Sequence, residues 1–461
     1  MIYDLDKRGS HPIYEYLYVC IKNDILTGKI APGEKLPSKR AFAKSQGVSV
    51  ITVENAYAQL LTEGYIYSEE KRGFFAGDIG GKYIQGKKKR IPVTQPQKED
   101  WLVNFKSNHI RYDNFPFSTW SKVMRQTLAD QELSFLESPE SQGVAPLRQV
   151  IALHLEKYRG LSVNPNNIIV GAGTEYLYGL IVQILGHSSM IAVEDPGHKK
   201  IGKVYESNGI RCVRIPVDRY GVKIEELWGS NALAVHISPS HHFPTGIVMP
   251  ANRRHKLIQW ARENETYIIE DDYDSEFRFS GRPIPTLASI DEERVIYMNT
   301  FSKTLAPSIR IAYMILPEPL MQVFREKFDF YSSTVSGFEQ YTLANFIKQG
   351  YYERHINRMR NYYREYRNHI LTAIRESRLW EKVTIEEENA GLHFILKIHQ
   401  EIEDGKYVEK LKKNGINIST VAEYCYNDDG NFKHQFIVNY SAVNEEDLKK
   451  ALEIMANALE E

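Results

Sequence analysis

Hydrophobic positions in the first eighty residues follow helical and then extended spacing. Apolar side chains recur at helical spacing over residues 12–27, ahead of Gly28. A turn-rich connector leads to Ser38, a good N-cap for a short helix that ends near Gly47. A longer segment over residues 50–63 presents a second apolar face. The pattern therefore predicts three helices, the last two separated by a tight turn.

Two short apolar segments follow these helices. Residues 65–68 and 74–76 have extended patterns, and a charged turn joins them, which predicts a β-hairpin. Three helices and a hairpin form a winged helix-turn-helix, in which the second helix of the motif enters the major groove of DNA. A winged helix that contacts another protein is the alternative interpretation. We expect a DNA-binding domain over residues 1–78.

The hydrophobic pattern is interrupted over residues 79–100. This stretch is polar, contains glycines and prolines, and includes the basic run 87–90. Such a composition predicts a basic, flexible linker. The basic run can contact DNA phosphates with a salt-dependent contribution, although runs of this kind are more often simply solvated.

From residue 101 onward, apolar strand-like segments alternate with amphipathic helical segments. The predicted strands lie at residues 167–170, 192–193, 232–237, 266–270 and 294–298, and helices are expected at 144–161, 175–185 and 252–264. This alternation predicts an α/β domain over residues 101–461 with a mainly parallel, doubly wound sheet. We expect a smaller C-terminal α+β subdomain from about residue 330. Ligands of such sheets bind beyond the carboxyl ends of the strands.

Composition and charge add limits to this interpretation. The chain has 461 residues, 42% of them hydrophobic, which favours two or more domains. No apolar run approaches the roughly 20 residues needed to span a bilayer, and the acidic N-terminus is unlike a secretory signal. Three scattered cysteines fit a reduced cytoplasm and exclude a cysteine-rich zinc site, and we expect no metal. Residues 1–90 carry a net charge of +5 and the remainder −6, a weak indication of nucleic-acid binding by the first part.

Three loops that follow predicted strands carry candidate chemistry. Residues 171–174 form a glycine-rich turn at a helix start, where backbone N–H groups and the helix dipole favour a phosphate. Residues 270–274 hold four acids and a tyrosine, and residues 299–310 hold hydroxyl side chains, Lys303 and Arg310. Each loop also has an ordinary interpretation: a common helix start, a solubilising or cation-binding acidic cluster, and a surface turn with an ordinary lysine. Together, however, they supply the parts of a pyridoxal-phosphate site.

The first quarter of the chain resembles the GntR family of bacterial regulators. The resemblance rests on the order Leu36-Pro37-Ser38-Lys39-Arg40, Gly47-Val48-Ser49, Glu63-Gly64-Tyr65 and Gly73-Phe74. It implies that DNA is faced by Ser38, Lys39, Arg40, Ser49, Thr52, Asn55, Lys71 and Arg72. The sequence departs from the family at Val50, where an arginine or lysine is usual, so one phosphate or base contact is lost.

The segment from residue 101 to the C-terminus resembles a fold-type I aminotransferase. The resemblance rests on Gly173-Thr174, Glu194-Asp195-Pro196-Gly197, Pro244-Thr245-Gly246, Glu270-Asp271-Asp272-Tyr273 and Ser302-Lys303 with Arg310. Behind a GntR-like domain, this combination is similar to the MocR subfamily of transcriptional regulators. It implies pyridoxal 5'-phosphate as cofactor and Lys303 as the lysine of the internal aldimine. It also implies that Asp271 pairs with the pyridine nitrogen and Tyr273 with the 3-oxygen, with Asp272 as a rival for the role of Asp271. The phosphate would be held by Gly173, Thr174, Thr300, Ser302 and Arg310.

Three departures from the aminotransferase pattern bear on activity. His198 stands where the family has a tyrosine stacked on the cofactor ring, and Phe243 stands where it has an asparagine. The late strand over residues 435–441 lacks the arginine that holds the substrate carboxylate. Lys200, Arg111 or Lys433 can replace it, and we name Arg111 and Lys200 as candidate effector-binding residues. Loss of a carboxylate clamp lowers turnover more than cofactor attachment.

The sequence thus predicts a cytoplasmic bacterial regulator that is nucleoid-associated when it binds DNA. It would sense an amine or amino-acid-like effector, or pyridoxal phosphate itself, through aldimine exchange at Lys303, with at most a vestigial transaminase half-reaction. The alternatives are a working aminotransferase with a DNA-binding appendage and a DNA-binding protein whose large domain only dimerises it. The resemblance also implies a domain-swapped homodimer that binds operator half-sites on double-stranded DNA.

Overall fold

The computed structural model describes residues 1–79, 100–107, 114–130, 137–279, 284–387, 391–427, 430–441 and 443–460. The chain divides into two compact units, Met1–Gln97 and Lys98–Glu461. The predicted linker lies almost wholly outside the described residues, so its bounds stay a prediction. No helix in the described parts of the chain is both long and apolar enough to cross a membrane.

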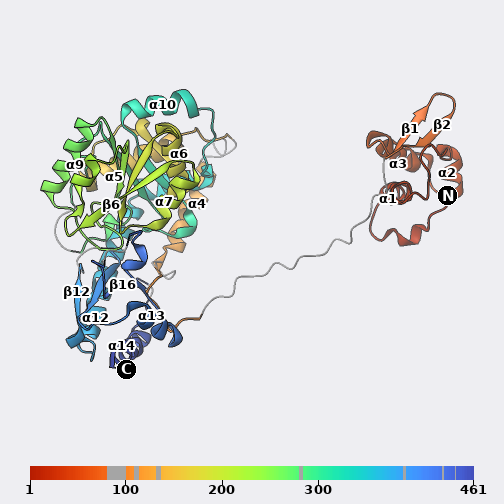
Figure 1. Cartoon of the computed structure of the whole chain (residues 1–461). Coiled ribbons are helices and arrows are strands. Elements are labelled where there is room, and N and C mark those ends of the chain that lie inside the picture. The colour runs from red at the N-terminus through yellow and green to blue at the C-terminus, as the bar shows by residue number, and fades with distance from the viewer. Residues whose placement is uncertain are drawn as a thin grey trace. The chain divides into compact units, whose positions relative to one another are not determined.

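The N-terminal unit contains three α-helices and a two-stranded antiparallel sheet (Figure 1). Its elements are η1 (Leu5–Arg8), α1 (Ile13–Leu26), α2 (Lys39–Gln46), α3 (Val50–Thr62), β1 (Ile66–Glu69) and β2 (Gly73–Ala76). The Ser38 side chain caps α2 by accepting from the Ala41 N–H, and Gly47 ends this helix in the left-handed region. Phe42, Tyr57 and Leu60 are fully buried between the helices. The unit is a winged helix-turn-helix, as the sequence predicts.

An eight-stranded sheet forms the centre of the C-terminal unit, in the order β4-β11-β10-β9-β8-β5-β6-β7. The five central strands, β10, β9, β8, β5 and β6, run parallel to one another. The strands β11 and β7 run antiparallel to their neighbours. The predicted mainly parallel sheet is therefore confirmed. The strands are β4 (Ile168–Gly171), β5 (Met190–Asp195), β6 (Arg211–Asp218), β7 (Gly221–Val222), β8 (Ala234–Ile237), β9 (Tyr267–Asp271), β10 (Val295–Thr300) and β11 (Ala312–Ile315).

Both faces of this sheet are buried, because successive side chains of a strand point to opposite faces. In β4, Ile168 and Val170 pack into one core, whereas Ile169 packs into the other. In β10, Tyr297 and Met298 are divided between the two cores in the same way. Helices cover each face: one side has α5 (Ala145–Arg159), α8 (Ile224–Trp228), α9 (Ala251–Glu263) and α11 (Gly337–Lys348), and the other has α6 (Thr174–Leu185), α7 (Lys199–Ser207) and α10 (Glu318–Phe328).

A second, four-stranded antiparallel sheet lies C-terminal to the large one, in the order β12-β13-β16-β15. Its strands are β12 (Val383–Glu386), β13 (His393–Ile398), β15 (Ser419–Thr420) and β16 (Gln435–Asn439), and its helices are α12 (Tyr351–Arg375), α13 (Asp404–Lys413) and α14 (Glu445–Glu460). A parallel pair, β3 (Val103–Asn104) with β14 (Ile416–Asn417), ties the start of the unit to this region. α4 (Phe117–Asp130) packs beside α11. The remaining short elements are η3 (Pro165–Asn167), η4 (Ser275–Phe277), η5 (Pro307–Ile309), η6 (Trp380–Lys382) and η7 (Ala422–Tyr424).

Candidate functional site

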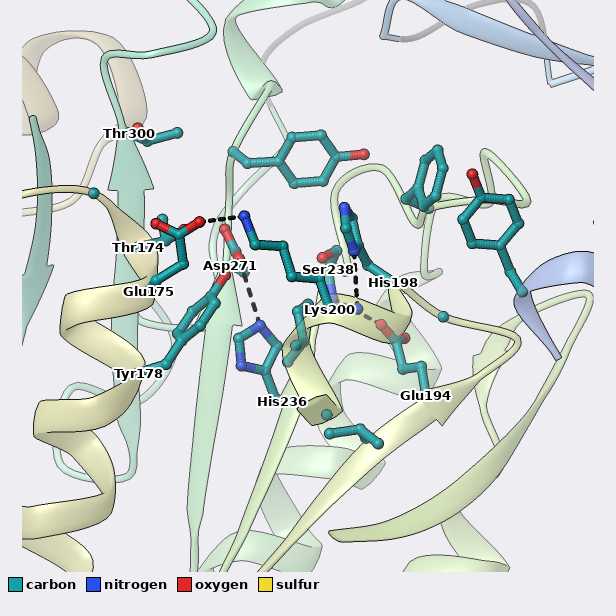
Figure 2. Close-up of a pocket in the computed structure, with 18 of the residues that line it drawn as sticks. Thr174, Glu175, Tyr178, Glu194, His198, Lys200, His236, Ser238, Asp271 and Thr300 are labelled. Atoms are coloured by element: carbon teal, nitrogen blue, oxygen red, sulfur yellow. Dashed lines mark hydrogen bonds and ion pairs between the residues drawn. The ribbon is translucent and has the colours of Figure 1, made fainter. Parts of the chain in front are cut away.

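A cavity of about 350 Å³ lies at the carboxyl ends of the parallel strands (Figure 2). Because parallel strands end at the same edge of a sheet, the loops after β4, β5, β8, β9 and β10 all reach it. The nine residues that the resemblance implies for the cofactor all line this cavity: Gly173, Thr174, His198, Asp271, Tyr273, Thr300, Ser302, Lys303 and Arg310. Lys200 lines it as well, whereas Lys433 is not among its lining residues and Arg111 lies outside the described residues.

One side of the cavity is a cationic cradle at the N-terminus of α6. The Glu175 carboxylate pairs there with both Arg310 and Lys200, and Figure 2 shows the latter contact. Gly173 has φ 88°, and a Cβ at this position would lie 2.6 Å from the Arg310 guanidinium. The main chain can therefore approach Arg310 only with glycine here. Two cations that share one carboxylate, beside the N–H groups at the start of a helix, leave a net positive charge that favours an anionic ligand.

The hydroxyl side chains of the loop after β10 have different environments. Thr300 Oγ1 accepts a hydrogen bond from the Ser302 N–H at 3.2 Å and lies 3.3 Å from the Ile311 carbonyl oxygen, to which it donates. The Thr300 hydroxyl therefore holds the turn in shape. Ser302 and Lys303 follow on this turn and are partly buried at the cavity.

The Asp271 carboxylate is buried at the end of β9, and one of its two oxygens is held by neighbouring side chains. Its Oδ2 accepts a hydrogen bond from the Tyr178 hydroxyl at 2.7 Å and lies 3.4 Å from His236 Nε2. His236 Nδ1 is 2.8 Å from the Tyr205 hydroxyl. Asp271 Oδ1, by contrast, has no hydrogen-bond partner in the described parts of the chain. A buried carboxylate oxygen without a partner is costly, so it favours a ligand that donates a hydrogen bond.

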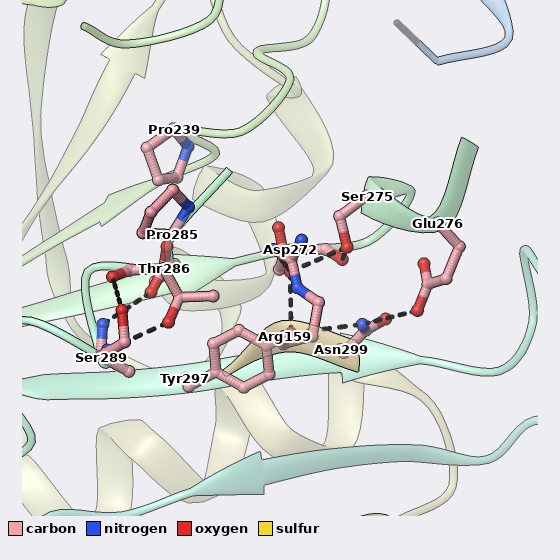
Figure 3. Close-up of polar contacts among 12 residues, drawn as sticks. Arg159, Pro239, Asp272, Ser275, Glu276, Pro285, Thr286, Ser289, Tyr297 and Asn299 are labelled. Atoms are coloured by element: carbon pink, nitrogen blue, oxygen red, sulfur yellow. Dashed lines mark hydrogen bonds and ion pairs between the residues drawn. The ribbon is translucent and has the colours of Figure 1, made fainter. Parts of the chain in front are cut away.

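Asp272 belongs to a different polar cluster (Figure 3). Its Oδ2 pairs with Arg159 Nη2 at 2.6 Å and accepts from the hydroxyls of Tyr297 and Ser275, each at 2.8 Å. Its side chain is fully buried, and it does not line the cavity. The two neighbouring acids therefore face different surroundings, and only Asp271 faces the candidate ligand.

Burial shifts the pKa of two groups at the cavity. It lowers the pKa of Lys303 to about 8 because the ammonium loses its hydration, and the Asp274 carboxylate opposes only part of this effect. Far more of the Lys303 amine is therefore neutral and nucleophilic near pH 7 than of an ordinary lysine, roughly one molecule in ten. Burial raises the pKa of Tyr273 well above its ordinary value, so this side chain stays a phenol that can donate a hydrogen bond.

The opposite side of the cavity is largely aromatic. Phe243 packs edge-on against Tyr424, with ring centroids 4.9 Å apart, and lies 5.5 Å from the His198 ring. Burial lowers the pKa of His198, which keeps its imidazole neutral. Asn439 of β16 and Lys106, which follows β3, also reach this side.

Several residues of the cavity were not predicted from the sequence. The strongest examples are Tyr178, His236 and Asn439. Tyr178 follows Thr174 by one helical turn, and His236 lies near the end of a predicted strand, so periodicity could have indicated both. Asn439 reaches the cavity through pairing of the C-terminal sheet, for which the hydrophobic pattern gave no signal. In the described parts of the chain, no group of His, Cys, Asp and Glu side chains could hold a metal ion.

The candidate DNA-contacting residues lie around α2, α3 and the hairpin of the N-terminal unit. Ser49 caps α3 by accepting from the Thr52 N–H at 3.1 Å, and Asn55 is exposed on the side of α3 away from its buried residues. Arg40 and the hairpin residue Lys71 are also exposed. Within the same unit, Lys39 pairs with Glu54, Arg72 pairs with Glu69, and Ser38 is engaged as the cap of α2.

These features define a winged helix-turn-helix joined to an aminotransferase-type domain, and comparisons with known proteins agree. Residues 13–76 match the bacterial regulatory proteins of the gntR family, and residues 101–455 match the aminotransferases of class I and II. The chain belongs to the GntR-type regulators that carry an aminotransferase domain, the MocR subfamily.

Similar proteins span both parts of the chain. One is the uncharacterized HTH-type transcriptional regulator YdeL of Bacillus subtilis, 39% identical over 91% of this chain and 91% of that protein. Another is the probable rhizopine catabolism regulatory protein MocR of Rhizobium meliloti, 28% identical over 98% and 95%. Among solved structures, the multiple substrate aminotransferase of Thermococcus profundus has a TM-score of 0.68 at 24% identity, covering 79% of this chain and 92% of that one. The last comparison supports the fold.

The cofactor of this type of domain is pyridoxal 5'-phosphate, and the residues of the cavity fit it. The unpartnered Asp271 Oδ1 can accept from a pyridinium N–H. Arg310 and the N–H groups at the start of α6, which lie close together because position 173 carries no side chain, suit a phosphate. Lys303 offers a partly neutral amine for an aldehyde. Each part of the cofactor therefore finds a group of the required chemistry.

Proposed function

We propose that this DNA-binding transcriptional regulator holds pyridoxal phosphate at Lys303 and senses a primary amine, or the cofactor itself, through that site. The observation that carries the proposal is the gathering of Lys303, the unpartnered Asp271 oxygen and the Gly173–Arg310 cradle around one cavity. When bound, the cofactor supplies an aldehyde that condenses with primary amines. The Lys303 amine would be released when an effector amine takes its place on that aldehyde.

The side chains around the cavity have separate roles in this proposal. Asp271, oriented by Tyr178, accepts from the pyridine nitrogen and favours its protonated form. The Tyr273 phenol donates to the 3-oxygen. Gly173, Thr174, Thr300, Ser302 and Arg310 hold the phosphate, and His198 covers the ring. Lys200 and Arg111 are the candidates for contact with the effector.

Regulation requires that the effector bind one arrangement of the protein better than another. We infer a homodimer in which each N-terminal unit is exchanged onto the partner chain, and large exposed side chains on the C-terminal unit support an interface: Phe117 is 66% exposed and Phe330 is 79% exposed. Analytical ultracentrifugation tests the dimer. A sedimenting monomer at micromolar concentration would contradict it.

The N-terminal unit would bind operator half-sites on double-stranded DNA. In the proposed interface, Arg40, Ser49, Thr52 and Asn55 lie around the helix that enters the major groove, and Ser38, Lys39, Lys71 and Arg72 contact the flanking backbone. Footprinting at low salt, upstream of the gene for this protein, should show two protected half-sites. A uniform cleavage pattern would remove the regulator proposal.

Cofactor attachment is tested by spectroscopy. Purified protein given pyridoxal phosphate should acquire a band near the visible edge that borohydride bleaches, and Lys303→Ala should lose this band. Lys433→Ala is a matched control, because Lys433 does not line the cavity. An equal band in Lys303→Ala would exclude Lys303 as the attachment site. Sustained release of keto acid from amino donors would instead favour the alternative, an aminotransferase with a DNA-binding appendage.

A further inference from the structure

One wall of the cavity is lined by Phe243, Tyr424, Asn439 and Lys106. Ile437 and Asn439 alternate on β16 and therefore share a face, and Ile437 is fully buried in a cluster packed against Phe243 and Tyr424. Ile437 does not itself line the cavity, so the apolar surface of this wall is provided by the rings of Phe243 and Tyr424. An effector that reaches it therefore buries an apolar body there.

The Asn439 side chain is a neutral polar group of this wall, and its orientation is fixed. Its Nδ2 donates a hydrogen bond to the Phe105 carbonyl oxygen at 2.7 Å, and the flipped amide would place two carbonyl oxygens against each other. Asn439 is 4% exposed, and its Oδ1 has no hydrogen-bond partner in the described residues. The wall thus presents one buried acceptor that no donor of the described chain satisfies.

The Lys106 ammonium on this wall already has a carboxylate partner. Lys106 lines the cavity one residue after Phe105, and its ammonium pairs with the Glu423 carboxylate at 3.0 Å. A carboxylate brought to this wall would meet the Asn439 oxygen, which repels it, and would compete with Glu423 for Lys106. A hydroxyl or amide N–H would satisfy Asn439 Oδ1 without either cost.

We propose that the effector is a primary amine with an apolar body and a hydrogen-bond donor, either a hydroxyl or a carboxamide. This donor takes the place that the carboxylate has in an amino acid. This inference rests on the proposed function, because it assigns the class of amine that the cofactor site accepts. Asn439 is the specificity-determining residue. Its acceptor selects such amines over the matching amino acids.

The test uses the full chain loaded with pyridoxal phosphate and three amines with one carbon skeleton: L-leucinol, L-leucinamide and L-leucine. Each is titrated while the spectrum of the bound cofactor is followed, and each half-saturation concentration is divided by that measured with free pyridoxal phosphate. This division removes differences in the intrinsic reactivity of the amines. We expect L-leucinol and L-leucinamide to be favoured over L-leucine by roughly tenfold or more. A preference for L-leucine would overturn the inference.

The same series is then measured on Asn439→Leu, which removes the acceptor at similar volume. The preference for L-leucinol over L-leucine should fall to near unity. Gln435→Leu is the matched control, because Gln435 lies on the same face of β16 but lines a different cavity, and it should keep the preference. If Asn439→Leu keeps the same preference for L-leucinol over L-leucine as the unmodified protein, Asn439 does not select the effector. Should Asn439→Leu not fold, the three-amine comparison on the unmodified protein decides alone.

The two levels of the proposal fail in different ways. Absence of any cofactor band, or a band that survives in Lys303→Ala, contradicts the proposed function itself. A normal cofactor band that responds best to L-leucine contradicts only the assigned class of amine.

Discussion

The lowered pKa of Lys303 makes the rate of cofactor capture a measurable function of pH. Burial moves this pKa from 10.5 to about 8. At pH 7, roughly one amine in ten is then neutral, against roughly three in ten thousand for an ordinary lysine, a difference of about 300-fold. Since only the neutral amine attacks an aldehyde, the capture rate should rise about tenfold per pH unit below pH 8 and level off above it.

Stopped-flow absorbance of apo-protein mixed with excess pyridoxal phosphate, from pH 6.5 to 10, measures this profile. Nα-acetyl-lysine in the same buffers supplies the profile of an exposed amine, and Lys303→Ala shows how much signal comes from other lysines. A capture rate that keeps rising with unchanged slope to pH 10 would refute the argument, because it would show that Lys303 titrates as a solvated side chain.

A second variant tests the cause of the shift. The Asp274 carboxylate stabilises the Lys303 ammonium and so opposes the effect of burial. Asp274→Asn should therefore lower the pKa of Lys303 further, and the profile should level off at a lower pH. A shift of the plateau to higher pH would show that the electrostatic effect has the opposite sign.

Three further predictions concern other parts of the molecule. Tyr178→Phe removes the hydrogen bond that orients Asp271 and should weaken cofactor binding by about fivefold in equilibrium dialysis, equivalent to about 1 kcal/mol. Arg159→Leu leaves Asp272 as a buried charge without its cation and should lower the free energy of unfolding by about 3–5 kcal/mol in urea titrations. Lys71→Ala should weaken binding to all DNA sequences alike and reduce the slope of log affinity against log salt by about 1.

Two of these predictions have a control variant in the same unit. Arg325→Leu breaks an ion pair whose two side chains are 40% and 50% exposed and should change the stability far less than Arg159→Leu does. Lys7→Ala, at the exposed 3₁₀ turn near the N-terminus, should leave the salt slope unchanged. An unchanged cofactor affinity in Tyr178→Phe would mean that His236 alone suffices to orient Asp271.

The sequence predicts the large sheet because both of its faces are buried and its strands alternate with amphipathic helices. It also predicts the gathering of Gly173, Asp271 and Lys303, since each follows a strand and the carboxyl ends of parallel strands meet at one edge. Strand β6 and helix α4 were not predicted. β6 is buried at only part of its positions, so its hydrophobic pattern is weak.

The choice between Asp271 and Asp272 could not be made from the sequence. Neighbouring residues at a strand end point to opposite sides, but only the packing shows which side holds the cavity and which holds Arg159. Asn439 and Lys106 were beyond prediction for a related reason. Lys106 is placed by the pairing of β3 with β14, which lie more than 300 residues apart in the chain, and Asn439 by the pairing of β16 with β13 and β15. Period-two patterns do not specify such partners.

The neutral Asn439 amide at the cavity wall explains how one cavity can serve sensing and disfavour turnover. Transamination needs the substrate held in a single reactive geometry, which a cationic clamp on its carboxylate provides. Sensing needs only that the effector bind one arrangement of the protein more tightly than the other. A neutral amide acceptor meets the second requirement and not the first, since one hydrogen bond fixes less of the geometry than a bidentate ion pair. Under the proposed function, replacing Asn439 with a cationic residue should therefore strengthen the binding of amino acids. The spectral response to amines that lack a carboxylate should not increase.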